Sequence, residues 1–495
     1  MKLSKIKKAV ALAAWMLAVQ PRYEAQAQHN ATMYFMRDLP AVNMLNPAFQ
    51  PEAGSIYVGM PLLSSVYFDG GITLGGMNIG NLLNNTPRLT KAAANPAPYE
   101  GAYANADVNL INVGILVRDM YFTFDITEKT RAEAAIPADV VRLAWYGNAP
   151  YIGKTIAINE LGAQVCSYAE IALGFSKDIV RDRITIGAKL KRLLGITFAD
   201  AEVGKDAFLQ TNADWSTTLR VSPEFNIAGI TESLPDDICT YEFAGKGWGM
   251  DMGFEIKNEL FIVSGSVLNV GVIRWRNVRH EKLETDAFEL TFRGAQLNGN
   301  TDLTKIIDTV KAQKFVRSSE NIWKWTPSTA TISVAYPLNK HLVAGALAGV
   351  AIGRYNSYPL LALSLSTWKH PINGSLSYSY SHSHNLGMGL LFGRREAQLH
   401  VICDNILAAD YQRAQKINLR LGLNLLLGAP RQTGDRKKTW APINTIDSPT
   451  NTYKTTGKPG PLNRLLSPTA QPTNKQPLNP TTGNSNAEPA REKKP

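Results

Sequence analysis

Strict alternation of apolar and polar residues near the end of the chain constrains its fold most. Between residues 417 and 427 every odd position is Ile or Leu, whereas the even positions include Asn418, Arg420 and Asn424. A period of two places these sets on opposite faces of a β-strand. The pattern recurs in roughly 14 segments, several of them long enough to cross a bilayer as tilted strands. It predicts an all-β fold, a transmembrane antiparallel β-barrel of about 14 strands.

The first 27 residues are typical of a secretory signal peptide. A lysine-rich start precedes an apolar run that is too short to span a membrane, and Ala25-Gln26-Ala27 supplies a small-x-small cleavage site. No later segment has the roughly 18 uninterrupted apolar residues of a transmembrane helix. We therefore expect an exported chain that resides in the outer membrane of a Gram-negative bacterium. An uncleaved anchor is the alternative interpretation.

The net charge of +11 is concentrated at the two ends of the chain. Residues 1–27 carry +4 and residues 430–495 carry +7, which leaves the body neutral. A neutral body does not indicate nucleic-acid binding. Residues 430–495 are rich in proline and poor in apolar residues, so we expect a disordered basic tail. A barrel with an even number of strands would place this tail in the periplasm.

The mature chain divides into a short irregular start and a long β-rich body. Residues 28–53 contain the turn-forming pair Asn46-Pro47, and we expect them to form a hatch inside or beneath the barrel. The barrel is predicted over residues 54–429. Within its long connections, residues 130–147 and 302–314 have apolar residues at helical spacing, which predicts two short loop helices.

Charged residues occupy the polar face of several alternating segments. A soluble sheet would have to expose such residues to solvent, whereas the wet lumen of a barrel accepts them. We predict that residues of both signs face the lumen: Asp125, Arg183, Lys189, Lys191, Asp251, Glu255 and Arg420. Mixed charges predict a lumen without strong ion selectivity.

The stretch around Asn46-Pro47-Ala48-Phe49 resembles known outer-membrane proteins. An Asn-Pro-Ala motif just after a signal peptide is similar to the N-terminal hatch of FadL-type barrels, which carry fatty acids and other hydrophobic molecules. Residues 34–51, 247–253 and 404–407 look more closely like an uncharacterised family of Bacteroidetes outer-membrane proteins. The link to FadL is an analogy of fold. The resemblance implies that Asn46, Pro47, Ala48 and Phe49 belong to a hatch, and a plain Asn-Pro turn is the alternative.

The chain carries few residues arranged for catalysis or metal binding. Cys166, Cys239 and Cys403 are far apart and odd in number, which is neither a disulfide framework nor a metal-ligand spacing, although a single pair is left open. One group of Ser, His and Asp residues is a candidate catalytic or metal cluster. Its first histidines follow tyrosines on the same strand face toward a turn, which is also the pattern of an aromatic girdle and its exposed loop. The cluster comprises Ser381, His382, Ser383 and His384, with His400 and Asp404 downstream. We expect no enzymatic activity, no metal and no cofactor.

The predicted function rests on the resemblance. It implies that the protein, a monomer surrounded by outer-membrane lipid, binds or passes a small hydrophobic molecule. An envelope scaffold or an accessory of a secretion machine, whose basic tail contacts an anionic periplasmic partner, is the alternative. A barrel-wall hydrolase is a second alternative. Uptake by the whole chain and by a tail-deleted form would separate the first two.

Overall fold

The computed structural model describes most of the predicted barrel. The described residues are 30–51, 55–61, 63, 65–72, 99–180, 183–229, 242–258, 260–293, 312–339, 342–353, 357–367, 372–381, 383–393, 397–409 and 416–427. The predicted signal peptide and the predicted tail lie outside these residues.

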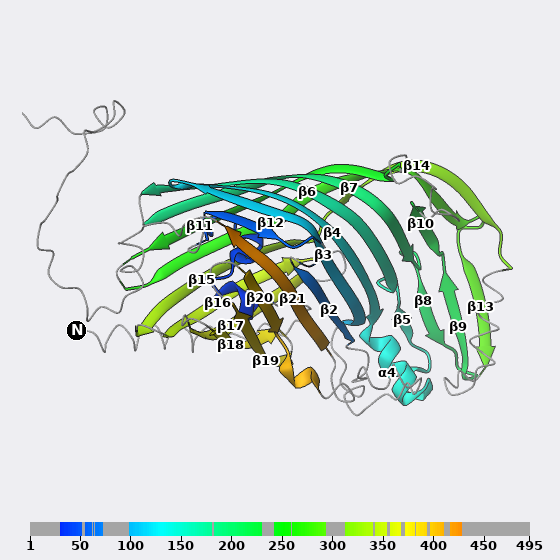
Figure 1. Cartoon of the computed structure of the whole chain (residues 1–495). Coiled ribbons are helices and arrows are strands. Elements are labelled where there is room, and N and C mark those ends of the chain that lie inside the picture. Colours follow the sequence, from blue (N-terminus) through cyan, green and yellow to red (C-terminus); the bar gives the residue numbers. More distant parts are fainter. Residues whose placement is uncertain are drawn as a thin grey trace, which may run out of the picture. The chain divides into compact units, whose positions relative to one another are not determined.

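Antiparallel strands close into a barrel of 14 strands (Figure 1), as the alternation predicted. β1 (Ile56–Gly59) and β2 (Val66–Ile72) share one position, because each pairs with β3 (Tyr99–Val117) on one side and with β21 (Lys416–Leu427) on the other. Between β3 and β21 the wall follows chain order: β4 (Met120–Pro137), β6 (Gly162–Val180), β7 (Ile184–Glu202), β10 (Glu224–Ala228) with β11 (Gly245–Lys257), β12 (Ile262–Leu283), β14 (Phe315–Trp325) with β15 (Ser328–Asn339), β16 (Leu342–Ile352), β17 (Ser357–Thr367), β18 (Ile372–Ser381), β19 (Ser383–Phe392) and β20 (Ala397–Cys403).

The barrel wall is taller on one side than on the other. β12 has 22 residues, whereas β20 has seven, and Figure 1 shows the long strands curving beyond the short ones. The tall side carries a second sheet of order β13-β9-β8-β5. Its strands are β5 (Thr155–Ala157), β8 (Phe208–Thr211), β9 (Ser216–Val221) and β13 (Phe288–Arg293). A small apolar core that includes Ile156 and Val221 holds this sheet together.

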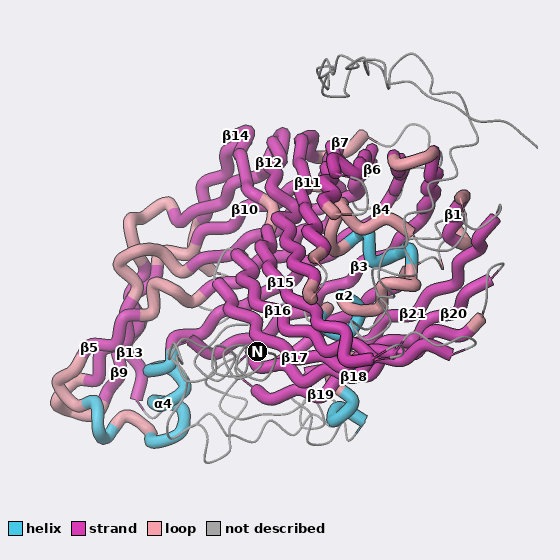
Figure 2. The backbone as a smooth tube through the Cα atoms, turned by 90° about the vertical axis from the view of Figure 1, so that its left-hand side faces the viewer, coloured by secondary structure: helices cyan, strands magenta, loops and turns pink. Residues whose placement is uncertain are grey.

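Two short helices precede the barrel and lie within it. They are α2 (Ala31–Tyr34) and the 3-10 helix η1 (Pro40–Met44). Figure 2 shows α2 in cyan, surrounded by the magenta strands, and its contacts are with β17 to β20. We call the segment of residues 30–51 the hatch.

The two ends of the barrel differ in their connections. A two-residue turn, Arg118 and Asp119, joins β3 to β4 at one end, where Arg118 adopts a φ of 60°. The side chain of Gln50 donates a hydrogen bond to the Asp119 carbonyl at 3.2 Å, so we call this end the hatch end. The opposite, loop end carries the longer connections and the second sheet. Both chain ends of the barrel, the start of β1 and the end of β21, therefore lie at the hatch end.

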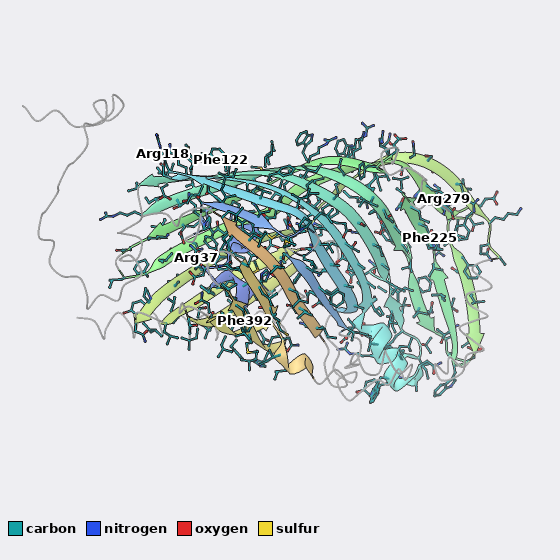
Figure 3. The ribbon with its side chains drawn as sticks, viewed as in Figure 1. Arg37, Arg118, Phe122, Phe225, Arg279 and Phe392 are labelled. Carbon is teal, nitrogen blue, oxygen red and sulfur yellow. The ribbon has the colours of Figure 1, made fainter. Side chains whose placement is uncertain are left out.

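Side chains alternate between the two faces of the wall. On β4, Phe122 is 45% exposed on the outer face, where Figure 3 labels it, whereas Thr123 and Asp125 are buried on the inner face. On β21, Leu421 is 41% exposed and Arg420 only 5%. The apolar set thus faces outward and the polar set lines the lumen.

The predicted loop helix at residues 130–147 is shorter than expected. Only α4 (Ala138–Tyr146) is helical, followed by the 3-10 helix η3 (Ala149–Tyr151). Residues 130–137 instead extend β4, where they pair with β3 and, as far as Ala135, with β6. Of the second predicted helix, residues 302–311 lie outside the described residues, and residues 312–314 are not helical. In the part of the chain that the structure describes, no helix is long and apolar enough to cross a membrane.

Candidate functional site

The hatch forms an apolar core with the inner wall of the barrel. Met33, Phe35 and Leu39 are buried in a cluster that also contains Leu347 of β16 and Leu360 of β17. Because burial of such side chains stabilises by roughly 1.5–3 kcal/mol each, the hatch is a docked element of the barrel.

Asn46 attaches the hatch to the backbone of the wall. Its side-chain amide donates to the carbonyls of Phe254 at 3.2 Å and Gly265 at 3.1 Å. Its Oδ1 accepts the backbone N–H of Ala48 at 2.9 Å, which closes a local turn. The side-chain amide of Asn46 therefore donates hydrogen bonds to the wall and accepts one within the turn. An aspartate could not do both, because a carboxylate has no donor.

Glycines on the inner wall let the Asn-Pro-Ala turn approach closely. A Cβ at Gly187 of β7 would overlap the backbone of Pro47 and Ala48, and one at Gly253 of β11 would overlap the Asn46 side chain. The hatch residues predicted from the resemblance therefore lie against the wall, and Phe49 is buried beside them.

Arg37 and Asp38 hold the hatch at the hatch end. Arg37, labelled in Figure 3, forms an ion pair with Glu255 of β11 and lies over the Phe49 ring at 3.4 Å. Glu255 also pairs with Lys257 at 3.0 Å. Asp38 accepts a hydrogen bond from Asn373 of β18 at 2.6 Å. These polar contacts to two separate strands fix the orientation of the hatch.

Polar contacts also hold the start of the hatch, deeper in the lumen. Thr32 donates its backbone N–H to Asp404 at 2.9 Å, and its hydroxyl lies 2.6 Å from that of Ser377. Asp404 follows β20, outside the strands, and burial raises the pKa of its carboxyl to about 6 against the opposing effect of the Thr32 hydrogen bonds. Asn30 accepts a hydrogen bond from Arg420 at 3.0 Å.

An ionic network covers the inner face of β4, β6, β7 and β11. Lys189 pairs with Asp125 at 2.8 Å. Lys191 pairs with Asp251 at 2.8 Å and with Glu170 at 3.2 Å, and Glu170 also pairs with Lys129 at 2.9 Å. All six side chains are buried, so these pairs are screened far less than surface pairs. The network joins four neighbouring strands.

Asn269 connects this network to β12. It adopts a φ of 59°, a left-handed conformation that asparagine tolerates, beside a register shift between β11 and β12. Its backbone N–H donates to Asp251 at 2.6 Å, and its Oδ1 accepts from Lys129 at 2.9 Å and Lys191 at 2.7 Å. The bulge therefore supplies both a donor and an acceptor to the charged cluster.

A cavity of about 90 Å³ lies between the hatch and this network. Its lining is two-sided. The ionic residues form one side, and the other side consists of aliphatic side chains from the hatch and the facing strands: Met44, Leu45, Leu268, Leu347 and Leu360. This cavity is the candidate functional site.

The structure brings most of the predicted lumen residues into one region. Asp125, Lys189, Lys191, Asp251 and Arg420 line the cavity. Glu255 contacts the hatch instead. Arg183 does not line this cavity; it lies in the turn before β7 and is exposed.

Sequence reasoning missed three members of the network: Lys129, Glu170 and Asn269. Lys129 lies on the same period-two face as Asp125, so the alternation of β4 could have identified it. Glu170 alternates in the same way on β6. No local signal marks Asn269, because its role depends on a bulge between two paired strands.

The described histidines of the predicted Ser-His cluster, His384 and His400, lie on different faces of the wall, and the side chains of Ser381 and Ser383 are outside the described part of the chain. His384 is exposed and stacks on Tyr378, whereas His400 is buried and lies 3.4 Å from Asn424. Asp404 contacts Thr32 of the hatch, and His382 lies outside the described residues. Among the described residues, no group of three or more His, Cys, Asp or Glu side chains could hold a metal ion. Cys166 and Cys403 are free thiols, and Cys239 lies outside the described residues.

A family model described as "Family of unknown function (DUF5723)" matches residues 47–404. The chain belongs to this family. The match runs from Pro47, within the Asn-Pro-Ala turn, to the residue after β20, so it covers most of the barrel and leaves out residues 30–46 of the hatch. It confirms the predicted resemblance to an uncharacterised barrel family, whereas a Bacteroidetes origin stays a prediction. A search of curated proteins found no match.

Solved outer-membrane barrels resemble the chain in general form. A FadL homologue of Pseudomonas aeruginosa has 10% identity and a TM-score of 0.38, with 81% of this chain and 98% of that chain covered. The toluene transporter TodX of Pseudomonas putida has 9% identity and a TM-score of 0.35, with 81% and 95% covered. The translocator domain of the autotransporter NalP from Neisseria meningitidis has 11% identity and a TM-score of 0.32, with 80% and 97% covered. The likeness concerns the fold alone.

Proposed function

We propose that this protein is an outer-membrane barrel that binds a small molecule in its lumen and lets it pass when the hatch moves. The observation that carries the proposal is the position of the hatch, which is docked inside the barrel with the two-sided cavity next to it. A lumen filled by its own segment is a closed state. Passage therefore requires the hatch to shift or leave.

The lining of the cavity supports a particular kind of molecule. The resemblance to FadL-type barrels implies a hydrophobic substrate, and Leu347 and Leu360 offer an apolar surface for one. The ionic side, with Lys189 and Asp125, would leave a purely apolar molecule against charged groups, at a cost in desolvation. We therefore propose a small amphiphile with an apolar body and a polar head.

A disulfide between hatch and wall tests whether the hatch must move. The hydroxyl oxygens of Thr32 and Ser377 lie 2.6 Å apart, so the Thr32→Cys/Ser377→Cys pair can reach the about 2.05 Å of an S–S bond with little adjustment. The natural cysteines are first replaced by serine. Liposome swelling in isotonic norvaline, a small zwitterion with an apolar side chain, then measures passage before and after reduction.

A matched control uses a disulfide that does not tether the hatch. Ser366 of β17 and Ser375 of β18 have hydroxyl oxygens 2.9 Å apart, and both lie in the wall. We expect the Thr32–Ser377 bridge to stop swelling until it is reduced, whereas the Ser366→Cys/Ser375→Cys variant swells equally in both states. Equal swelling by the oxidised and reduced hatch variant would overturn the proposal.

The remaining features of the proposal rest on the predicted export signal and the barrel. We propose that the protein resides in the outer membrane as a monomer and acts without catalysis. The alternative scaffold function depends on the tail at residues 430–495, which lies outside the described residues. A tail-deleted form should swell as the whole chain does under the transport proposal, whereas a scaffold would lose its partner and show no solute passage in either form.

A further inference from the structure

Arg420 is a buried cation, and its contacts with the described residues are neutral. It lies on β21 with 5% of its surface exposed and lines the cavity. Its guanidinium donates to the Ser65 hydroxyl at 2.6 Å and to the Asn30 side-chain oxygen at 3.0 Å. Its planar group lies over the Tyr67 ring at 4.4 Å. Among the described residues, Arg420 forms no ion pair.

The carboxylates that line the same cavity are occupied by other cations. Asp107 pairs with Arg131 at 2.5 Å, Asp125 pairs with Lys189, and Glu170 and Asp251 share Lys191. The lining therefore supplies no counter-charge that is reserved for Arg420.

Asp107 of the lining and Asp404 interact electrostatically with Arg420, but both contact other groups. Asp107 pairs with Arg131, and Asp404 accepts the backbone N–H of Thr32 at 2.9 Å. Neither forms an ion pair with the guanidinium among the described residues. Their charges reduce the cost of burying Arg420 without satisfying its donors.

A buried charge without a partner is costly, and an arginine fork matches a carboxylate in geometry. We infer that Arg420 is an anion-binding site for the carboxylate of a small solute. The cavity of about 90 Å³ holds only a few non-hydrogen atoms while the hatch is docked, so the solute is short. Leu347 and Leu360 face its apolar part. This site deepens the proposed function, because it assigns the polar head of the amphiphile.

Binding of a carboxylate at Arg420 would also affect the hatch. Asn30, the first described hatch residue, occupies one of the guanidinium donors. An anionic head is a stronger acceptor than a neutral amide, so it displaces Asn30. Of the polar contacts that residues 30–32 make with the wall, those of Thr32 with Asp404 and Ser377 would then be left. Ligand occupancy is in this way coupled to the start of the hatch.

Calorimetry on the purified whole chain in detergent tests the site without any transport. The organic probes each contain four carbon atoms and differ in the head group: butyrate, butanol and butylammonium, with inorganic phosphate as a second anion. We expect saturable binding of butyrate and no saturation with butanol or butylammonium. Phosphate that binds as tightly as butyrate would show a general anion site and overturn the assignment to carboxylates.

Variants then locate the binding. Arg420→Gln should weaken butyrate binding about tenfold or more, which corresponds to about 1.4 kcal/mol. Asn30→Ala should tighten it, because the competing amide is gone. Arg192→Gln is the matched control, because this substitution changes the net charge by the same amount as Arg420→Gln. Arg192 lies over the exposed Trp248, away from the cavity lining. The control variant should bind butyrate as the wild type does.

The results of the butyrate-binding experiment can be distinguished from those of the hatch disulfide experiment. Wild-type affinity in Arg420→Gln, or no saturable butyrate binding by the wild type, would overturn the site even if the locked hatch stops swelling. If Arg420→Gln does not fold, Arg420→Lys keeps the charge and loses the fork, and the proposal then requires weaker binding by that variant. Equal swelling by the oxidised and reduced Thr32→Cys/Ser377→Cys variant, together with butyrate binding by the wild type, would instead overturn the transport proposal alone.

Discussion

Individual inner-wall residues decide how closely the hatch can lie to the strands. Phe35 occupies the space that a side chain at Gly345 of β16 would fill. Asn46 donates to two wall carbonyls through one amide group. The contact surface thus depends on the absence of a side chain at one position and on a specific amide at another.

Replacement of Asn46 by Asp should release this part of the hatch. The carboxylate would face the carbonyls of Phe254 and Gly265 without a proton to donate, which leaves buried acceptors unpaired at a cost of about 1–3 kcal/mol. We expect more frequent opening events in planar bilayers for Asn46→Asp than for the wild type. Asn43→Asp, whose amide contacts only carbonyls within the hatch, provides the comparison. Identical opening frequencies in wild type and Asn46→Asp would contradict the role of the amide.

Replacement of Leu421 by Arg tests the assignment of the outer face. Leu421 is exposed on β21, and an arginine facing lipid near the middle of a bilayer costs roughly 2–4 kcal/mol. Denaturant unfolding in lipid vesicles should show that loss for Leu421→Arg, and a much smaller one for Leu421→Phe. Equal stabilities of the two variants would place this position away from lipid.

At the scale of elements, the hatch and the ionic wall form opposite sides of one cavity. The hatch is attached at its start by Thr32 and at the hatch end by Arg37. The ionic wall is held by salt bridges among neighbouring strands and by the Asn269 bulge. The hatch is held by apolar packing and a few hydrogen bonds, whereas the wall strands are joined by continuous backbone pairing, so the hatch is the element expected to move first.

Deletion of residues 28–53 should open the lumen. The apolar cluster between hatch and wall would be lost, and water would reach the inner faces of β16 and β17. We expect a higher single-channel conductance in planar bilayers for the deleted form than for the whole chain. A form that lacks residues 430–495 serves as the control for loss of chain length. Conductance that does not change on hatch deletion would argue against closure by this segment.

For the whole molecule, the lumen combines both signs of charge in buried pairs. Asp125, Glu170 and Asp251 neutralise Lys129, Lys189 and Lys191, and Arg420 adds one further cation. Paired charges give small net fields along a pore, so the hatch-deleted barrel should pass cations and anions at similar rates. Reversal potentials in a salt gradient measure this ratio, and a value near the limit for either ion would contradict a balanced lumen.

The side of the membrane on which the tail lies depends on whether the barrel has an even or an odd number of strands. Fourteen strands put both ends of the barrel at the hatch end, so residues 430–495 should lie on the periplasmic side if the hatch end faces the periplasm. Trypsin added to intact cells should spare the tail, whereas permeabilised cells should lose it by cleavage near Lys437 and Lys438. Cleavage in intact cells would reverse the proposed orientation.

The amino-acid sequence alone was enough to predict the fold class and the facing of the strands, because alternation is a local property with a period of two. It placed Asp125, Lys189 and Arg420 on one face and Leu421 on the other, and the Asn-Pro-Ala turn marked the hatch. Its helix at residues 130–147 began too early, since pairing with β3 extends β4 to Pro137 and pairing with β6 continues as far as Ala135.

Which inner residues become neighbours depends on the pairing of distant strands, so it could not be predicted from the sequence. Asp251 lies directly opposite Lys189 in the register of β11 and β7, yet its carboxylate pairs with Lys191, and Lys189 reaches Asp125 across β6. Arg37 and Glu255 meet across 218 residues of chain. Such partners depend on strand stagger and on closure of the barrel, and neither quantity is encoded in the spacing of residues along one strand.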